Sequence, residues 1–224
     1  MTIECPSHLH ITFIIFWLRF IASTAQLVTT YAGGGPTGNV DATGTSASFG
    51  GTTGGNLACV AFDIFTSSGN IFVTDLAGTT AGGFVRMVTP GRLVSTLAGN
   101  AANYASIDGI GTGASFYGPS GLAVSIYDGV IVAEASRIRS VMLTGVTSTI
   151  SGGALSSHQD GCGTSALFTF PTGIATSNFM GYERVYFITD SSRIRMMVYD
   201  NPTSTFCVST VAGSAAGNAV DGAA

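Results

Sequence analysis

The stretch DGIGTGASFYGPSGLAVS, residues 108–125, returns further along the chain as DGCGTSALFTFPTGIATS, residues 160–177. The two copies share the pattern Asp-Gly-x-Gly-Thr-x-Ala-x-Phe-x-x-Pro-x-Gly at equal offsets, and such recurrence is typical of repeat architectures. A looser copy, DATGTSASFG, occupies residues 41–50, and a further one begins at Asp221. The repeated positions that we single out are Asp41, Asp108, Gly109, Gly111, Thr112, Phe116, Pro119, Asp160, Gly161, Gly163, Thr164, Phe168, Pro171 and Asp221.

Three other sequence patterns recur between these copies, always in the same order. An apolar segment rich in β-branched residues ends in an acid, a second segment carries arginine, and a third, rich in threonine and serine, ends in glycine. Because the arginine fork favours bidentate contact with carboxylates, we expect structural acid–arginine pairs here. The residues concerned are Asp75, Arg86, Glu134, Arg137, Arg139, Asp190, Arg193 and Arg195.

Each unit therefore consists of four short β-rich segments separated by glycine, asparagine and aspartate turns. A single four-stranded sheet cannot cover both of its own faces and must stack on neighbours, so the pattern predicts an all-β fold made of propeller blades. The order VSTLAG, DGxGTxAxFxxPxG and RIR resembles the NHL repeat, over residues 28–224. The resemblance implies a partial β-propeller of four-stranded blades, a fragment of a six-bladed ring. The blades span about 28–99, 99–152 and 152–213, and a fourth starts at 214–224.

The resemblance also implies where each segment lies. The Pro-x-Gly strand is innermost, the threonine-rich strand is outermost, and the Asp-Gly-x-Gly segment crosses from the rim of one blade to the hub of the next. We expect Asp108 and Asp160 to accept backbone N–H groups in a tight turn, and Phe116 and Phe168 to wedge between adjacent sheets.

The amino-terminal segment differs from the rest of the chain. An apolar run from Ile11 to Leu18 is followed by the small residues Ser23, Thr24 and Ala25, which predicts a signal peptide over residues 1–25. An uncleaved signal anchor and a misassigned start are the alternatives. With a leader or an anchor, the protein is secreted or displayed at the cell surface.

Cysteine and histidine are scarce outside this leader. Cys59, Cys162 and Cys207 remain, so one disulfide can form in an oxidising compartment, and which pair forms is open. We expect no metal site and no cofactor, because the cysteines lack metal-ligand spacing and His158 is the single remaining histidine. His158 is expected to be a solvated loop residue.

The charge balance limits the partners. The net charge is −4, and the eight basic residues are all arginine, so a broad phosphate-binding face and a nucleic-acid partner are not expected. No catalytic motif is present either, and we assign no catalytic residue.

These observations favour a non-catalytic extracytoplasmic scaffold or receptor ectodomain that binds a protein or glycan through loops at the blade ends. The alternative is a propeller enzyme, a metal-dependent lyase or hydrolase whose catalytic residues lie mainly in blades outside this chain. We also expect either a membrane tether in sequence outside this chain or self-association of an open propeller.

Overall fold

The computed structural model describes residues 28–51, 55–78, 82–177 and 184–214. The chain divides into two compact units at Thr30, and the few described residues of the first unit contain no helix or strand. The leader over residues 1–25, the repeat start at Asp221 and most of the 214–224 segment lie outside the described residues. No helix among the described residues is both long and apolar enough to cross a membrane.

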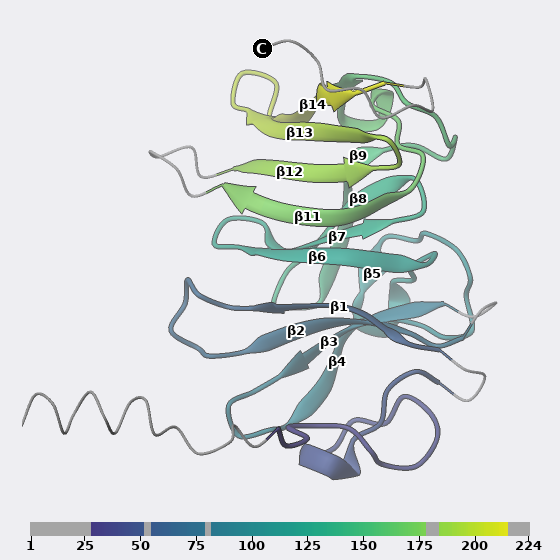
Figure 1. Ribbon diagram of the computed structural model, residues 1–224, viewed down its shortest axis with the longest axis vertical. Helices are drawn as coiled ribbons and strands as arrows, with labels where there is room; N and C mark the ends of the chain where they lie inside the picture. The colour runs from purple at the N-terminus through teal and green to yellow at the C-terminus, as the bar shows by residue number, and fades with distance from the viewer. Residues whose placement is uncertain (1–27, 52–54, 79–81, 178–183, 215–224) are drawn as a thin grey trace, which may run out of the picture. The chain divides into compact units, whose positions relative to one another are not determined.

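The second unit contains three antiparallel sheets that follow one another along the chain (Figure 1). The first sheet is formed by β1 (Leu57–Phe62), β2 (Ile71–Leu76), β3 (Gly83–Val88) and β4 (Val94–Gly99). The second contains β6 (Pro119–Ser125), β7 (Gly129–Glu134), β8 (Arg137–Val141), β9 (Val146–Gly152) and the short β5 (Gly109–Ile110). The third contains β11 (Pro171–Ser177), β12 (Val185–Asp190), β13 (Arg193–Asp200), β14 (Thr205–Gly213) and the short β10 (Gly161–Cys162).

In each sheet the four main strands pair in sequence order, as expected for a meander of short β-branched strands joined by tight turns. The described residues contain no α-helix, only the 3₁₀ turns η1 (Gly44–Ser46), η2 (Gly111–Gly113) and η3 (Gly163–Ser165). The predicted all-β class, a partial propeller of four-stranded sheets, is confirmed.

The Asp-Gly segments add a feature that the sequence did not predict. β5 pairs with β9 and β10 pairs with β14, so each segment forms a fifth strand on the outer edge of the sheet that it is about to enter. In the first sheet this fifth strand is reduced to a single bridge between Thr43 and Leu93. The crossing thus protects the outer edge of a sheet before the chain reaches the inner strand.

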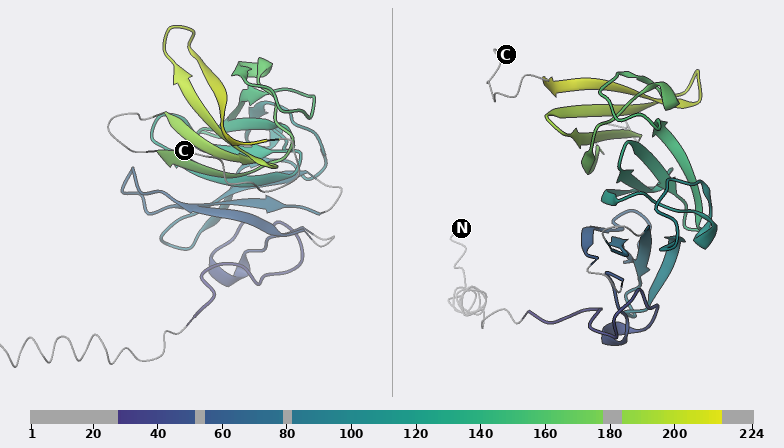
Figure 2. Two further views of the ribbon diagram at one scale, coloured as in Figure 1. Left: turned by 45° about the horizontal axis from the view of Figure 1, so that its top comes forward. Right: turned by 90° about the vertical axis from the view of Figure 1, so that its right-hand side faces the viewer.

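The core lies between successive sheets (Figure 2). Phe116 is fully buried together with Phe72 and Val85 of the first sheet, and Phe168 is fully buried together with Ile131 of the second sheet. At the inner edge, β6 contacts both β1 and β11. There Ser120 accepts a hydrogen bond at its carbonyl from the Thr74 hydroxyl at 2.7 Å, and its own hydroxyl donates to the Pro171 carbonyl at 2.8 Å.

Candidate functional site

Each sheet holds one fully buried arginine that joins two carboxylates. In the second sheet Arg139 Nη1 lies 2.5 Å from Glu134 Oε1, and Nη2 lies 2.5 Å from Asp108 Oδ1. Glu134 ends β7 and is fully buried, whereas the Asp108 side chain on the crossing segment is half exposed. The arginine therefore connects the crossing segment to the interior of the sheet.

The first and third sheets repeat this arrangement. Arg86 contacts Asp75 and Asp41, both at 2.7 Å. Arg195 contacts Asp190 at 2.8 Å and Asp160 at 2.9 Å. The residues expected to form acid–arginine pairs thus come together in three places, each time with a crossing aspartate as a second acid.

A phenylalanine and a backbone N–H complete each arrangement, which we call the crossing clamp. The rings of Phe49, Phe116 and Phe168 lie 5.2, 5.3 and 5.2 Å from the guanidinium carbons of their arginines, within cation–π distance. The second oxygen of each strand acid accepts the N–H of the residue after that phenylalanine, at 2.7–2.8 Å. These residues are Gly50, Tyr117 and Thr169.

The crossing aspartates have a different role from the one expected. Asp41 and Asp160 accept the backbone N–H of Thr96 and Thr210 on the outer strand, at 2.9 and 3.0 Å, rather than N–H groups of their own turn. The hydroxyl of Thr149 donates to Asp108 at 3.1 Å. The expectation of an aspartate that closes a local turn is therefore corrected, because the donors that reach these aspartates belong to the outer strand and to the arginine.

A polar residue two positions before each crossing aspartate was missed as a repeated feature. Asn39 donates to Asp75 at 2.6 Å, the side chain of Ser106 hydrogen-bonds Glu134, and His158 Nδ1 lies 3.1 Å from Asp190 Oδ2. The side-chain lengths are complementary. The short Ser106 pairs with the longer glutamate, and the longer Asn39 and His158 pair with the shorter aspartates. His158 was expected to be solvated, but its side chain is 22% exposed and contacts a clamp acid.

Two of the arginines assigned to pairs behave differently. Arg137 Nη1 donates to the Ser106 carbonyl at 3.0 Å, and within the described residues no carboxylate lies at ion-pair distance from Arg137 or Arg193. Alternate residues of a strand share a face, so Arg137 lies on the same face of β8 as Arg139, and Arg193 on the same face of β13 as Arg195. Arg137 and Arg193 begin their strands and stand directly opposite Glu134 and Asp190 in the register, yet these acids pair with Arg139 and Arg195.

The strand acids and the crossing aspartates differ in the direction of their pKa shifts. Burial raises the pKa of Asp75 and of Glu134, against the opposing effects of their arginines and hydrogen bonds. Burial also acts to raise the pKa of Asp160, but the hydrogen bonds from Thr210 together with Arg195 lower it overall. All of these carboxylates are occupied by protein donors, and the described residues contain no group of three or more side chains suited to hold a metal ion.

The cysteine pairing left open by the sequence is decided by strand register. Cys162 of β10 lies directly opposite Cys207 of β14, and the two are joined by a disulfide. Cys59 on β1 is free. The disulfide ties the crossing segment to the outer strand of the third sheet.

Arg184, which had no assigned role, joins the second and third sheets. Its Nε lies 3.0 Å from Asp128 Oδ2 in the β6–β7 turn, and its guanidinium carbon lies 3.3 Å from the centre of the Tyr199 ring. Tyr186 also donates to Asp128, at 2.5 Å, and burial followed by this hydrogen bond raises the pKa of the tyrosine. The sequence signal was weak because these residues do not repeat.

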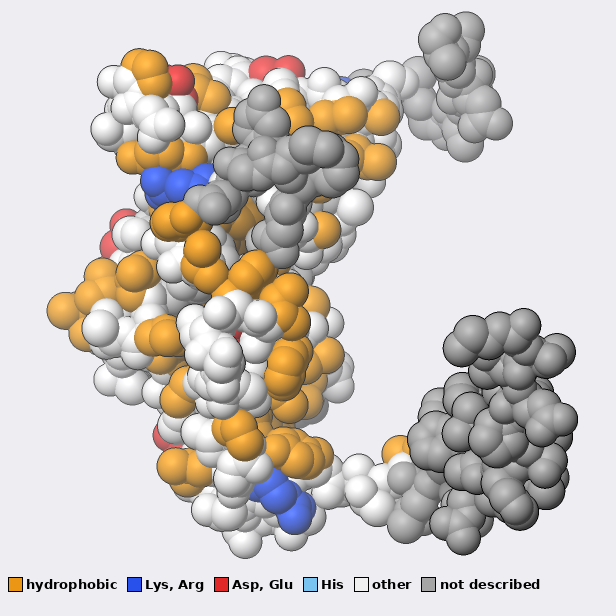
Figure 3. Space-filling view, turned by 90° about the vertical axis from the view of Figure 1, so that its left-hand side faces the viewer, with side chains coloured by type: hydrophobic (Ala, Val, Ile, Leu, Met, Phe, Trp, Pro, Cys, Tyr) orange, Lys and Arg blue, Asp and Glu red, His pale blue; other side chains and the backbone are white. Residues whose placement is uncertain are grey.

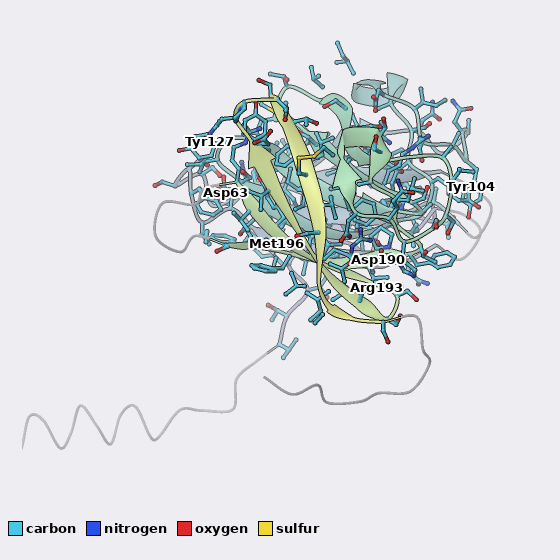
Figure 4. The ribbon with its side chains drawn as sticks, turned by 90° about the horizontal axis from the view of Figure 1, so that it is seen from above. Asp63, Tyr104, Tyr127, Asp190, Arg193 and Met196 are labelled. Atoms are coloured by element: carbon cyan, nitrogen blue, oxygen red, sulfur yellow. A yellow bond between two sulfur atoms is a disulfide. The ribbon has the colours of Figure 1, made fainter. Side chains whose placement is uncertain are left out.

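At the opposite end of these strands lies a groove of about 210 Å³ that we call the aromatic groove. Tyr104 and Tyr117 come from one crossing, with ring centres 4.2 Å apart and planes at 64°, and Phe170 comes from the next crossing. All three side chains are exposed, Phe170 by 64%. Figure 4 shows Tyr104 on the same side as Asp190, with Tyr127 of the β6–β7 turn on the other side.

The clamps hold the backbone of the aromatic groove. Glu134 accepts the N–H of Tyr117, and Asp190 accepts the N–H of Phe170 at 3.1 Å. Ser120, Pro171 and Thr172 also line the groove, and no charged side chain is among the described residues that line it. Unlike the clamp residues, the groove residues differ from one crossing to the next. In the first crossing Gly50 stands at the position of Tyr117, and Gly51 stands at the position of Phe170.

Comparison with known proteins identifies no family. No protein-family model matches the chain, and no curated protein matches it. Among solved structures, a structural genomics protein of unknown function from Bacteroides thetaiotaomicron is 21% identical, with a TM-score of 0.47 over 64% of this chain. An auxiliary nutrient binding protein from the same organism is 16% identical, with a TM-score of 0.47 over 67% of this chain. The matches span 33% and 37% of those two proteins, about a third of their length.

Proposed function

We propose that this chain is an NHL-like, non-catalytic scaffold outside the cytoplasm that binds a glycan or a protein segment at the aromatic groove. The observation that carries the proposal is three exposed aromatic side chains gathered around a groove without charged lining. Exposed aromatic residues on otherwise rigid loops are typical of binding sites.

The lining favours a glycan. Aromatic faces pack against the C–H faces of a sugar ring. The Ser120 hydroxyl already donates to the Pro171 carbonyl and the Thr172 hydroxyl is paired with that of Thr189, and each hydroxyl oxygen can in addition accept a hydrogen bond from a sugar hydroxyl group. Burial and the neighbouring Tyr117 raise the pKa of Tyr104, so this side chain stays neutral at physiological pH. A neutral lining suits a neutral ligand.

Two observations support a location outside the cytoplasm. The apolar run from Ile11 to Leu18 has the length of a signal-peptide core. A disulfide between Cys162 and Cys207 persists in an oxidising compartment and is uncommon in the cytosol.

The proposal is tested with the full chain secreted from a eukaryotic host and applied to an array of neutral and acidic oligosaccharides. We expect binding to neutral sugars, and titration calorimetry with the strongest binder should show that Tyr117→Ala and Phe170→Ala each weaken affinity about tenfold or more. The matched control is Tyr127→Ala, an exposed tyrosine at the far end of β6, which should bind as the native chain does.

Two results would count against this function. If no sugar binds, and displayed peptides are captured in a Tyr117-dependent manner, the ligand is a protein segment. If sugars bind equally well to both groove variants, the aromatic groove is not the site.

A further inference from the structure

The face of the third sheet that points away from the second exposes positions that are buried in the other two sheets. Three positions before the strand acid of each clamp stands a large apolar residue. In the first two sheets these residues, Phe72 and Ile131, are 0% exposed, whereas Phe187 in the third sheet is 38% exposed. The residue before each clamp arginine follows the same rule, since Val85 and Ile138 are 0% exposed and Ile194 is 44% exposed.

The structure shows what covers these positions in the first two sheets. Phe72 and Val85 pack against Phe116, Leu122 and Val124, which belong to the next crossing and the next inner strand. Ile131 and Ile138 likewise pack against Phe168 of the following crossing. In Figure 2, β13 and β14 stand at the end of the series of sheets, and no described sheet lies beyond them.

The first sheet exposes the complementary half of the same contact. Val60 pairs with Val73, and Leu122 pairs with Val132, so Val60 and Leu122 hold equivalent places on their inner strands. By the same register Phe62 corresponds to Val124. Leu122 and Val124 are 3% and 9% exposed, whereas Val60 and Phe62 are 64% and 54% exposed.

We infer that the two exposed faces bind each other between two copies of this chain. The tail face, formed by Phe187, Ile194 and Val211 of the third sheet, receives the head face, formed by Val60 and Phe62 of the first sheet of a second copy. Both faces are uncharged and apolar, and their counterparts already form this contact twice within the chain. The contact is heterologous, because different surfaces of the two copies meet.

The test uses two charged variants of the full secreted chain, Phe62→Glu on the head face and Phe187→Glu on the tail face. By sedimentation velocity, the native chain should self-associate with rising concentration, and each variant alone should associate at least about tenfold more weakly. An equimolar mixture of the two variants should form a one-to-one dimer, since one intact head and one intact tail remain. If each face instead bound the same face of a second copy, mixing the two variants would not restore association.

Leu155→Glu is the control, because Leu155 is 71% exposed on a crossing segment outside both faces, and it should associate as the native chain does. A native chain that stays monomeric, or two variants that do not complement each other, would overturn the inference. A monomer in which hydrogen exchange at β13 is slow would instead point to cover by another segment of the same polypeptide. Sugar binding by the monomeric variants distinguishes this failure from failure of the aromatic groove.

Discussion

Three buried arginines, one in each sheet, organise the repeated residues. Each of Arg86, Arg139 and Arg195 neutralises a buried acid and holds a crossing aspartate, and each packs on a phenylalanine. A buried ion pair contributes less to stability than its contacts suggest, because both charges lose water. Removing one partner is nevertheless costly, because it leaves the other charge unpaired in the core. The clamps therefore give the repeated aspartates a structural role.

Arg139→Met tests this reasoning at one clamp. The substitution leaves Glu134 buried without its cation, so we expect the free energy of unfolding to fall by about 3–5 kcal/mol. Urea denaturation measures the change. Arg137→Met is the control, since Arg137 is only half-buried and contacts one carbonyl, and its effect should be much smaller. Equal losses in the two variants would contradict the role of the clamp.

Acid pH should weaken the fold partly through Asp160. Its folded-state pKa is lowered, by Thr210 and Arg195 against the effect of burial, so its stabilisation is complete above the unfolded pKa of about 3.9 and is lost as pH falls through the folded pKa. We expect Asp160→Asn to show a shallower loss of stability below about pH 4 than the native chain. Urea midpoints at a series of pH values measure this difference. The raised pKa of Glu134 acts in the opposite sense but is common to both proteins and cancels.

The inner strands explain why the motif reads Pro-x-Gly. At Gly121 of β6, a side chain would place its Cβ 2.0 Å from the Thr172 carbonyl oxygen of β11. Glycine therefore permits the close approach of two inner strands from successive sheets. Figure 3 shows the end of the sheets that carries the β1–β2 and β6–β7 turns, where many apolar and few charged side chains lie at the surface.

Gly121→Ala should separate β6 from β11. Because the clash is with backbone rather than a flexible side chain, we expect a loss of about 1–3 kcal/mol in the free energy of unfolding. The control is Gly113→Ala in η2, where an added Cβ meets nothing within 4 Å. Thermal unfolding monitored by circular dichroism compares the two variants, and a control that melts as low as Gly121→Ala would refute the packing argument.

In the molecule as a whole, successive sheets are joined by apolar packing and by a few polar contacts that occur only once. Arg184, Asp128 and Tyr186 form such a contact between the second and third sheets, where Asp128 is 6% exposed. The aromatic groove lies at the other end of the same two sheets. Its geometry therefore depends on how firmly these sheets are held together.

Arg184→Met should loosen the third sheet before the others. Asp128 would lose its cation, and we expect faster hydrogen exchange at β12 and β13 than at β2 and β3. Mass spectrometry of exchanged peptides measures this contrast. Arg92→Met, which removes a contact with the Tyr31 carbonyl near the first sheet, should leave exchange in the third sheet unchanged. Uniform acceleration across all three sheets would show that the chain opens as a single unit.

The all-β class and the order of strands were predictable from the sequence, because turn chemistry and alternating apolar residues act over a few neighbouring positions and recur in every repeat. The equivalence of Asp108 and Asp160 was visible for the same reason. Their contacts with Arg139 and Arg195 were not, since these depend on β5 and β10 reaching the outer edges of their sheets. The pairing of Cys162 with Cys207 and the meeting of Tyr117 with Phe170 also join distant or non-repeated positions. Only the stacking of sheets brings such residues together, and no local pattern encodes it.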